Sequence, residues 1–185
     1  MKQVGLGTIL ILTGSRGAGK TTLCNRLIDE ARVRGWQVAG VLSPAQFDRG
    51  EKTGIQAQDV RTQSRRPLAK RRSSKNSPST PPATLDTQTW KFEESALAWG
   101  NQLLKAAVPC DLLVIDELGP LEFEQGKGWS AGFEAVDSRR YRFAVVVIRP
   151  HYVESARKRW PDSLVLDLSA MPLDQLEQRI RSILF

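Results

Sequence analysis

Short apolar runs alternate with helical patterns along most of this chain. Runs with the length and composition of strands occur at residues 7–13, 37–43, 112–115, 143–148 and 164–168. Helical patterns occupy residues 20–34, 90–107, 129–139, 151–159 and the segment from 172 onwards. Strands that alternate with helices predict a mostly parallel, doubly wound sheet whose two faces are covered by helices. We therefore expect an α/β fold in a single domain over residues 1–185.

Two segments depart from this alternation. Residues 44–60 are polar around a turn-rich centre at 49–54, which predicts a β-hairpin with a longer loop. Residues 61–85 combine a basic run with serines and prolines and contain few large apolar residues. Such a segment buries too little surface to offset the entropy cost of ordering it. The composition therefore predicts a flexible insertion at 61–85.

The positive net charge of +7 is concentrated in that insertion. Seven basic residues and no acidic residue fall within 61–75, and the rest of the chain has 20 basic and 20 acidic residues. The excess charge therefore describes one segment and says little about the whole surface.

The other bulk properties indicate a protein of the cytoplasm. The longest apolar runs, at 9–12 and 144–148, are of strand length, so we expect no membrane span. The N-terminal run leads into glycines and lacks the core of a signal peptide. Cys24 and Cys110 lie far apart without the spacing of metal ligands, so we expect no disulfide framework and a reducing compartment.

A glycine-rich loop stands between the first predicted strand and the first predicted helix. Residues 14–21 match G-x-x-x-x-G-K-[ST] at every fixed position. Glycines let such a loop wrap closely around phosphate oxygens, and its N–H groups and the positive end of the next helix form an anion site. The motif predicts a P-loop for a nucleoside triphosphate, with Lys20 on the β- and γ-phosphates and Thr21 on Mg²⁺. The predicted nucleotide-binding residues are Gly14, Ser15, Arg16, Gly17, Ala18, Gly19, Lys20, Thr21 and Thr22.

A second motif lies where the apolar run at 112–115 ends in two carboxylates, Asp116 and Glu117. Ligands of such sheets bind at the carboxyl ends of the strands, so both motifs belong to one edge. Asp116 is the predicted partner of Thr21 in holding Mg²⁺. Glu117 is the predicted general base, or the residue that orients the attacking water. The pair favours the branch of P-loop proteins with recombinase-like and motor ATPases, in which a further strand separates the two motif strands.

Together the motifs predict Mg²⁺-dependent hydrolysis of nucleoside triphosphates, such as ATP or GTP, to diphosphate and phosphate. One alternative is a nucleoside or nucleotide kinase, in which a hydroxyl acceptor replaces water. Another is a nucleotide-gated module that binds RNA or protein through 61–75. The basic run itself has three interpretations, which are a solvated loop, a lid over the triphosphate and a nucleic-acid contact, the last weakened by the lack of interleaved aromatic residues.

Residues 12–23 and 114–122 resemble the small P-loop nucleoside-triphosphatase family of thermophiles, of the cancer-related nucleoside-triphosphatase type. The second segment, Val-Ile-Asp-Glu-Leu-Gly-Pro-Leu-Glu, is the more specific of the two. The resemblance implies slow hydrolysis of several nucleoside triphosphates with Mg²⁺. It also implies that Glu122 lies at the site as a further catalytic residue.

The sequence departs from that family at the predicted hairpin. The family has a Glu-hydrophobic-Arg triplet where this chain has Ala45, Gln46 and Phe47. The family's motif ahead of the middle helix, with a glycine and an aromatic residue, is not evident in 78–89. These changes bear on base preference, rate and partner docking, and they leave the phosphate and Mg²⁺ residues intact.

Two further residues follow the apolar run at 143–148. Arg149 would suit a cation supplied in cis to the γ-phosphoryl group, although loop arginines are common. We interpret His151, the only histidine, as a surface residue. Because no dedicated arginine finger is identifiable, slow turnover is expected for the isolated protein.

Overall fold

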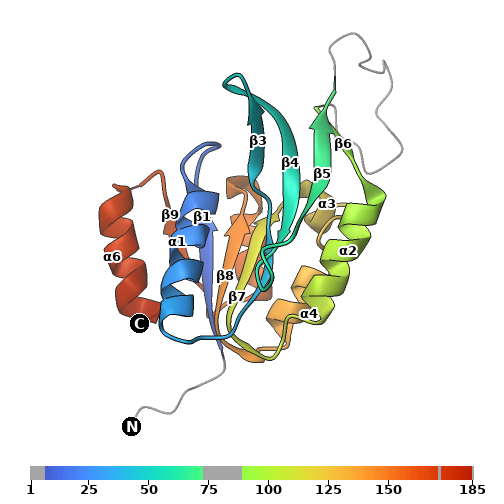
Figure 1. The fold of residues 1–185 in the computed structure, drawn as a ribbon. Helices are drawn as coiled ribbons and strands as arrows, with labels where there is room; N and C mark the ends of the chain where they lie inside the picture. Colours follow the sequence, from blue (N-terminus) through green and yellow to red (C-terminus); the bar gives the residue numbers. More distant parts are fainter. Residues whose placement is uncertain (1–6, 73–88, 171, 185) are drawn as a thin grey trace.

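The computed structural model of the protein describes residues 7–72, 89–170 and 172–184 (Figure 1). The strands are β1 (Thr8–Thr13), β2 (Val38–Leu42), β3 (Ala45–Asp48), β4 (Glu51–Asp59), β5 (Arg65–Arg71), β6 (Trp90–Phe92), β7 (Cys110–Leu118), β8 (Tyr141–Ile148) and β9 (Leu164–Asp167). The helices are α1 (Lys20–Val33), α2 (Glu94–Lys105), α3 (Pro120–Phe123), α4 (Ala131–Asp137), the 3-10 helix η2 (Pro150–Tyr152), α5 (Val153–Arg159) and α6 (Leu173–Leu184). The predicted alternation of strands and helices is present.

All of these strands belong to one sheet, in the order β6-β5-β4-β2-β7-β8-β1-β9, with β3 paired to β4. The strands β2, β7, β8, β1 and β9 run parallel to one another, which confirms the predicted α/β fold with a mostly parallel core. Strand β8 lies between β1 and β7, the strands that carry the two motifs, as the sequence predicts. Strands β3 to β6 extend the sheet in antiparallel fashion beyond β2.

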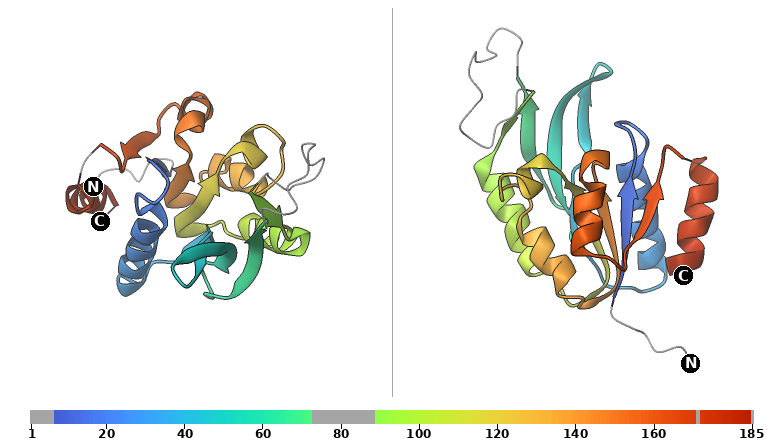
Figure 2. Two further views of the ribbon diagram at one scale, coloured as in Figure 1. Left: turned by 90° about the horizontal axis from the view of Figure 1, so that it is seen from above. Right: turned by 180° about the vertical axis from the view of Figure 1, so that it is seen from behind.

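Helices cover both faces of the parallel strands (Figures 1 and 2). Along β1, Leu10 and Leu12 pack with the apolar faces of α1 and α6, whereas Ile9 and Ile11 belong to the cluster that includes α2, α4 and α5. This alternation places one apolar layer on each side of the sheet, which is the arrangement expected of a doubly wound sheet. None of the helices in residues 7–72, 89–170 and 172–184 has both the length and the apolar character of a membrane span.

The prediction of a flexible insertion at 61–85 is wrong for its first part. Residues 65–71 form β5, which pairs with β4 on one side and β6 on the other. Leu68 and Ala69 are buried there, at 3% and 1% exposure. Ladder hydrogen bonds on both edges and two buried side chains order a segment whose composition is mostly basic. Residues 73–85 lie outside the described part of the chain.

The helix predicted from residue 90 begins later, because Trp90–Phe92 pairs with β5 as strand β6. Strands β3 and β4 pair within the region predicted as a hairpin, with a register shift between Gln46 and Phe47. Several arginines of the basic run also make structural contacts. Arg61 donates to the carbonyl oxygens of Ala106 and Ala107, where α2 ends.

Glycine 40 is required where β2 and β7 approach each other. Its φ is +123°, and a Cβ atom there would lie 1.8 Å from the carbonyl oxygen of Val114 on β7. Since Gly40 and Val114 are register partners in the sheet core, neither backbone has room to move away. This close contact sets the spacing between β2 and the strand that carries Asp116.

We predict that Gly40→Ala lowers the free energy of unfolding by more than about 3 kcal/mol, because strain at positive φ adds to overpacking. The matched control is Gly35→Ala, which has φ +73° but no atom within 4 Å of the added Cβ. It should cost only about 1–2 kcal/mol. Denaturant unfolding of both variants measures the difference, and equal losses would show that the contact with Val114 is not limiting.

Candidate active site

The predicted P-loop, residues 14–21, joins β1 to α1 at the carboxyl edge of the sheet (Figure 1). Gly14, Gly17 and Gly19 have φ values of +138°, +83° and +92°, a region that side chains disfavour. Gly19 is the N-cap of α1, and none of the described side chains caps this end of the helix. Glycine is thus needed in the loop for its backbone conformation, and the positive end of α1 points at the place where an anion would lie.

Lys20 lies against the inside of this loop. Its ammonium donates to the carbonyl oxygens of Gly14 at 2.7 Å and Ser15 at 2.8 Å. These contacts hold the charge within the curve of the loop. Ser15, Arg16 and Thr22 are exposed around it, whereas Ala18 is partly buried and packs toward the α1 core. The loop therefore presents Lys20 as its central cation.

The two motifs meet at a hydrogen bond. The hydroxyl of Thr21 on α1 donates to Oδ2 of Asp116 on β7 at 2.7 Å. Asp116 is only 3% exposed, and burial raises the pKa of its carboxyl group to about 6, while the bond from Thr21 acts in the opposite direction. The Asp116–Glu117 peptide bond is cis. The residues predicted to hold Mg²⁺ are thus in direct contact.

Ser43, just after β2, also contacts this aspartate and was missed in the sequence. Its backbone N–H donates to Oδ2 of Asp116 at 3.3 Å, and its hydroxyl donates to the backbone carbonyl of Asp116. Strand β2 is the parallel neighbour of β7, so the same strand-end rule that selected Asp116 also selects Ser43. The contacts fix the orientation of the buried carboxylate.

The oxygen atoms of this group fit Mg²⁺. A hydroxyl and a carboxylate are hard oxygen ligands, and this ion commonly takes one or two protein ligands together with waters and phosphate oxygens. Among residues 7–72, 89–170 and 172–184, no group of three or more His, Cys, Asp or Glu side chains is arranged to hold a metal. Thr21 and Asp116 are therefore suited to an ion shared with a phosphate, rather than to an ion held by protein alone.

Glu117 is paired with Arg149, which follows β8. Nε of Arg149 lies 2.5 Å from Oε1 of Glu117, and both side chains retain solvent exposure, 56% and 27% respectively. Gly119 allows this approach, since a Cβ atom there would lie 3.2 Å from Nε of Arg149. Because β8 lies between β1 and β7, the ion pair stands at the strand ends beside the P-loop.

Glu122 is buried beside the turn that follows β7, at 7% exposure. Its Oε2 accepts the N–H of Gly119 at 2.8 Å, and its Oε1 accepts the N–H of Trp129 at 2.7 Å. Burial raises the pKa of Glu122 to about 7 despite these donors. A Cβ atom at Gly128 would lie 2.0 Å from Oε1, so the carboxyl group is closely enclosed. The described contacts of both oxygens are with the backbone.

Other residues considered from the sequence lie away from this arrangement. His151 is exposed on η2, and Glu124 accepts a hydrogen bond from the hydroxyl of Tyr152. Cys24 is buried in α1, and it and Cys110 are free. Ser169, after β9, accepts the N–H of Ser15 at 3.0 Å, which brings a segment that the sequence did not indicate against the P-loop.

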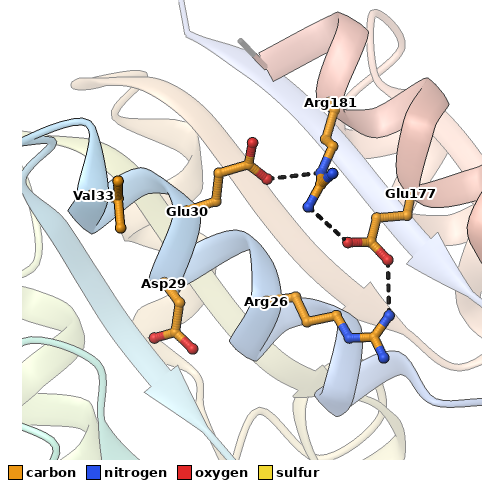
Figure 3. A pocket seen from close by; sticks show the side chains of 6 residues that line it. All are labelled: Arg26, Asp29, Glu30, Val33, Glu177 and Arg181. Carbon is orange, nitrogen blue, oxygen red and sulfur yellow. Dashed lines mark hydrogen bonds and ion pairs between the residues drawn. The ribbon is translucent and has the colours of Figure 1, made fainter.

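A groove between α1 and α6 is separate from the motifs (Figure 3). Arg181 pairs there with Glu30 at 2.8 Å and with Glu177 at 3.1 Å, and Arg26 pairs with Glu177 at 2.9 Å. Glu30 and Glu177 are thus paired with the two arginines of the groove, and Asp29 pairs with Arg32 at 3.4 Å. These contacts attach α6 to α1 and offer no unpaired charge to a ligand. The lining residues are Arg26, Asp29, Glu30, Val33, Glu177 and Arg181.

Comparison with known proteins agrees with this geometry. The model of the NTPase protein family matches residues 9–180. The nucleoside-triphosphatase THEP1 of Thermococcus kodakarensis is 30% identical over 137 residues, which cover 74% of each chain. The THEP1 of Methanopyrus kandleri is 25% identical over 173 residues, which cover 92% of each chain.

Two solved structures share the fold. A human cancer-related nucleoside triphosphatase has a TM-score of 0.69 at 20% identity, with 96% of this chain and 97% of that chain covered. THEP1 from Aquifex aeolicus has a TM-score of 0.62 at 17% identity, with 96% and 99% covered. Since the family match extends from β1 into α6 and includes both motifs, the chain belongs to the NTPase family with the THEP1 proteins and is a P-loop nucleoside-triphosphatase.

Proposed function

We propose that the protein hydrolyses nucleoside 5′-triphosphates, such as ATP and GTP, to diphosphate and phosphate in a reaction that requires Mg²⁺. The observation that carries this proposal is the contact between Thr21 and Asp116 at 2.7 Å, with Glu117 as the next residue. One place thus combines a phosphate loop, oxygen ligands suited to Mg²⁺ and a carboxylate for the attacking water.

The phosphate chain is bound by the P-loop. Backbone N–H groups and the positive end of α1 favour the anion, and Lys20 supplies the central positive charge for the β- and γ-phosphates. Thr21 and Asp116 would hold Mg²⁺, and the bound ion would neutralise part of the charge on these phosphates. Gly14, Ser15, Arg16, Gly17, Ala18, Gly19 and Thr22 complete the proposed nucleotide-binding set.

Glu117 is the proposed general base, or the residue that orients the attacking water. Its ion pair with Arg149 directs the carboxylate toward the ends of β7 and β8. Nε of Arg149 is occupied by Glu117, but a guanidinium has further N–H donors that suit phosphate oxygens. Arg149 is therefore the proposed cation in cis for charge that develops on the γ-phosphoryl group.

Glu122 acts, in our proposal, as a positioning residue rather than as a catalytic one. Its carboxyl group joins the N–H groups of Gly119 and Trp129, which lie on either side of α3. These bonds fix the turn directly after β7 and hence the backbone that carries Glu117. Glu122 follows the motif closely in the sequence because it orders this turn. The family resemblance had instead implied a catalytic role.

The basic segment needs no separate function to explain several of its residues. Arg61 bonds to the end of α2, Arg65 bonds to Gln58 and Arg66 lies 4.6 Å from the ring of Trp99. A contact of 61–75 with nucleic acid or protein stays a hypothesis. No contact of the described residues specifically favours it over hydrolysis.

We predict that removal of divalent cations by EDTA lowers the hydrolysis rate by at least about 100-fold, since the ion neutralises phosphate charge at the site. Added Mg²⁺ should restore the rate. In Asp116→Asn, the Mg²⁺ concentration for half-maximal rate should rise on the order of tenfold or more, because one anionic ligand is lost. A steady-state titration measures both effects, and an unchanged Mg²⁺ requirement in the variant would remove Asp116 from the metal site.

We predict that Glu117→Gln lowers kcat by about 100-fold or more with little change in KM, because the amide cannot accept the proton of the attacking water. Phosphate release from ATP, GTP, CTP and UTP measures the effect. The control is Glu124→Gln, whose carboxylate is bonded to Tyr152 instead.

Parent-like hydrolysis by Glu117→Gln would refute its assignment as base. The same assay distinguishes a kinase. If an added nucleoside or nucleotide acceptor becomes phosphorylated much faster than phosphate is released, hydrolysis is not the main reaction.

We predict a pH-dependent difference in stability between the wild type and Glu122→Gln. With a pKa of about 7 when folded and near 4.5 when unfolded, Glu122 binds more protons in the folded state between these values. Its contribution to stability is thus present below pH 4.5 and declines as pH rises to 7, by on the order of 3 kcal/mol.

Denaturant unfolding of both proteins at several pH values tests this prediction. The unfolding free energy of the wild type, relative to that of Glu122→Gln, should fall across the interval from about pH 4.5 to 7. A constant difference would show that the pKa of Glu122 is the same in the folded and unfolded states. Near-normal kcat in Glu122→Gln at a temperature where it is folded would support the positioning role.

A further inference from the structure

Lys52 lies on β4 next to the turn of the β3–β4 hairpin. The hairpin rises beyond the carboxyl edge of the parallel strands, on the same side of the molecule as the P-loop (Figures 1 and 2). Its neighbours Glu51 and Thr53 are exposed, whereas Lys52 is partly buried. A lysine near a hairpin turn would ordinarily be solvated, so its burial requires an explanation.

The charges around Lys52 are those of the active site. Its ammonium interacts electrostatically with Arg16 in the P-loop, Asp116 and Glu117 on β7, and Arg149 after β8. Burial and Arg16 lower the pKa of Lys52, and Glu117 and Asp116 oppose that shift. Lys52 is therefore within electrostatic reach of charged side chains at the ends of β1, β7 and β8.

The Lys52 side chain also contacts Trp90 on β6. The ammonium of Lys52 lies 5.2 Å from the centroid of the Trp90 ring, within the range of a cation–π contact. This contact connects Lys52 to the far edge of the sheet. The ammonium thus has an aromatic partner while the side chain stays partly exposed.

Positive charges outnumber negative charges among Lys52 and the side chains that act on it. Lys52, Arg16 and Arg149 bring three positive charges to this group, and Glu117 and Asp116 bring two negative charges. Cations placed together in a partly buried site repel one another unless an anion is present. A bound triphosphate would add negative charge to this group.

We propose that Lys52 is a phosphate-binding residue of the nucleotide site, delivered by the β3–β4 hairpin to the γ-phosphate of a bound triphosphate. This inference rests on the proposed function and extends its binding site to the antiparallel part of the sheet. The γ-phosphate is favoured over the α- and β-phosphates because Lys52 interacts with Glu117 and Arg149, the pair at which hydrolysis is proposed to occur. The hairpin thereby distinguishes triphosphate from diphosphate.

Equilibrium binding tests this inference without the need for turnover. The ligands are Mg²⁺ with β,γ-imido-ATP, and Mg²⁺ with ADP. Lys52→Ala should weaken binding of the triphosphate analogue by on the order of tenfold and binding of ADP by less than about twofold. The reason is that only the γ-phosphate loses a charge-assisted contact. Lys52→Arg should bind both ligands within about threefold of the wild type, because it keeps the charge.

Lys91→Ala is the matched control, since Lys91 is an exposed lysine on β6, which β5 separates from β4. It should bind both ligands as the wild type does. Equal weakening of the analogue and ADP in Lys52→Ala would indicate that the lysine only supports the hairpin and would overturn the inference. Unchanged binding of the analogue would overturn it as well.

The outcomes separate this inference from the proposed hydrolysis. If Glu117→Gln loses turnover while Lys52→Ala binds both ligands normally, hydrolysis stands and the role of Lys52 fails. If the wild type shows no turnover but Lys52→Ala selectively loses affinity for the analogue, the role of Lys52 stands and the proposed hydrolysis fails. Thermal unfolding of each variant verifies that the binding changes do not arise from loss of folded protein.

Discussion

The hydrogen bond between Thr21 and Asp116 is the contact on which the site depends. It joins the first turn of α1 to the end of β7, two segments that are 95 residues apart in the chain. The bond lies at the carboxyl edge of the parallel strands, where β8 lies between β1 and β7 and Gly40 lets β2 approach β7 closely. A buried carboxylate without hydrogen bonds would be costly, so Thr21 and Ser43 also contribute to the stability of the sheet edge. The carboxylate of Asp116 therefore belongs both to the proposed Mg²⁺ site and to the contacts that stabilise the fold.

The parallel half of the fold was predictable because local pattern and global fold agree there. Buried strands such as β1 and β8 are continuous apolar runs, and the glycines of the P-loop are required by backbone angles that side chains disfavour. The same agreement made Asp116 and its contact with Thr21 predictable. A strand end and a loop motif each occupy a fixed place in this type of sheet, so their meeting follows from topology.

The antiparallel half was predicted less well because its order comes from pairing. Strand β5 contains Arg65, Arg66, Lys70 and Arg71, and only Leu68 and Ala69 are buried in its centre. Neither residue produces a strand-like pattern, whereas β4 and β6 supply hydrogen bonds along both edges. Ser43, Glu122 and Lys52 were missed or given another role for a related reason. Their partners lie on other elements or on the backbone, and no spacing in the sequence records such contacts.

The two halves of the sheet supply different groups to the proposed triphosphate site. The parallel strands place the P-loop, Asp116 and Glu117 at one edge, and this arrangement is sufficient to bind a phosphate chain and an ion. In this arrangement, Arg149 forms an ion pair with Glu117, and Lys20 donates hydrogen bonds to carbonyl oxygens of the loop. Each cation thus has a protein partner that a phosphate oxygen can replace, and the side chain of Lys52 has the ring of Trp90. Because these partners hold the cations in place before the ligand arrives, the entropy cost of ordering them is met largely by folding and not by binding.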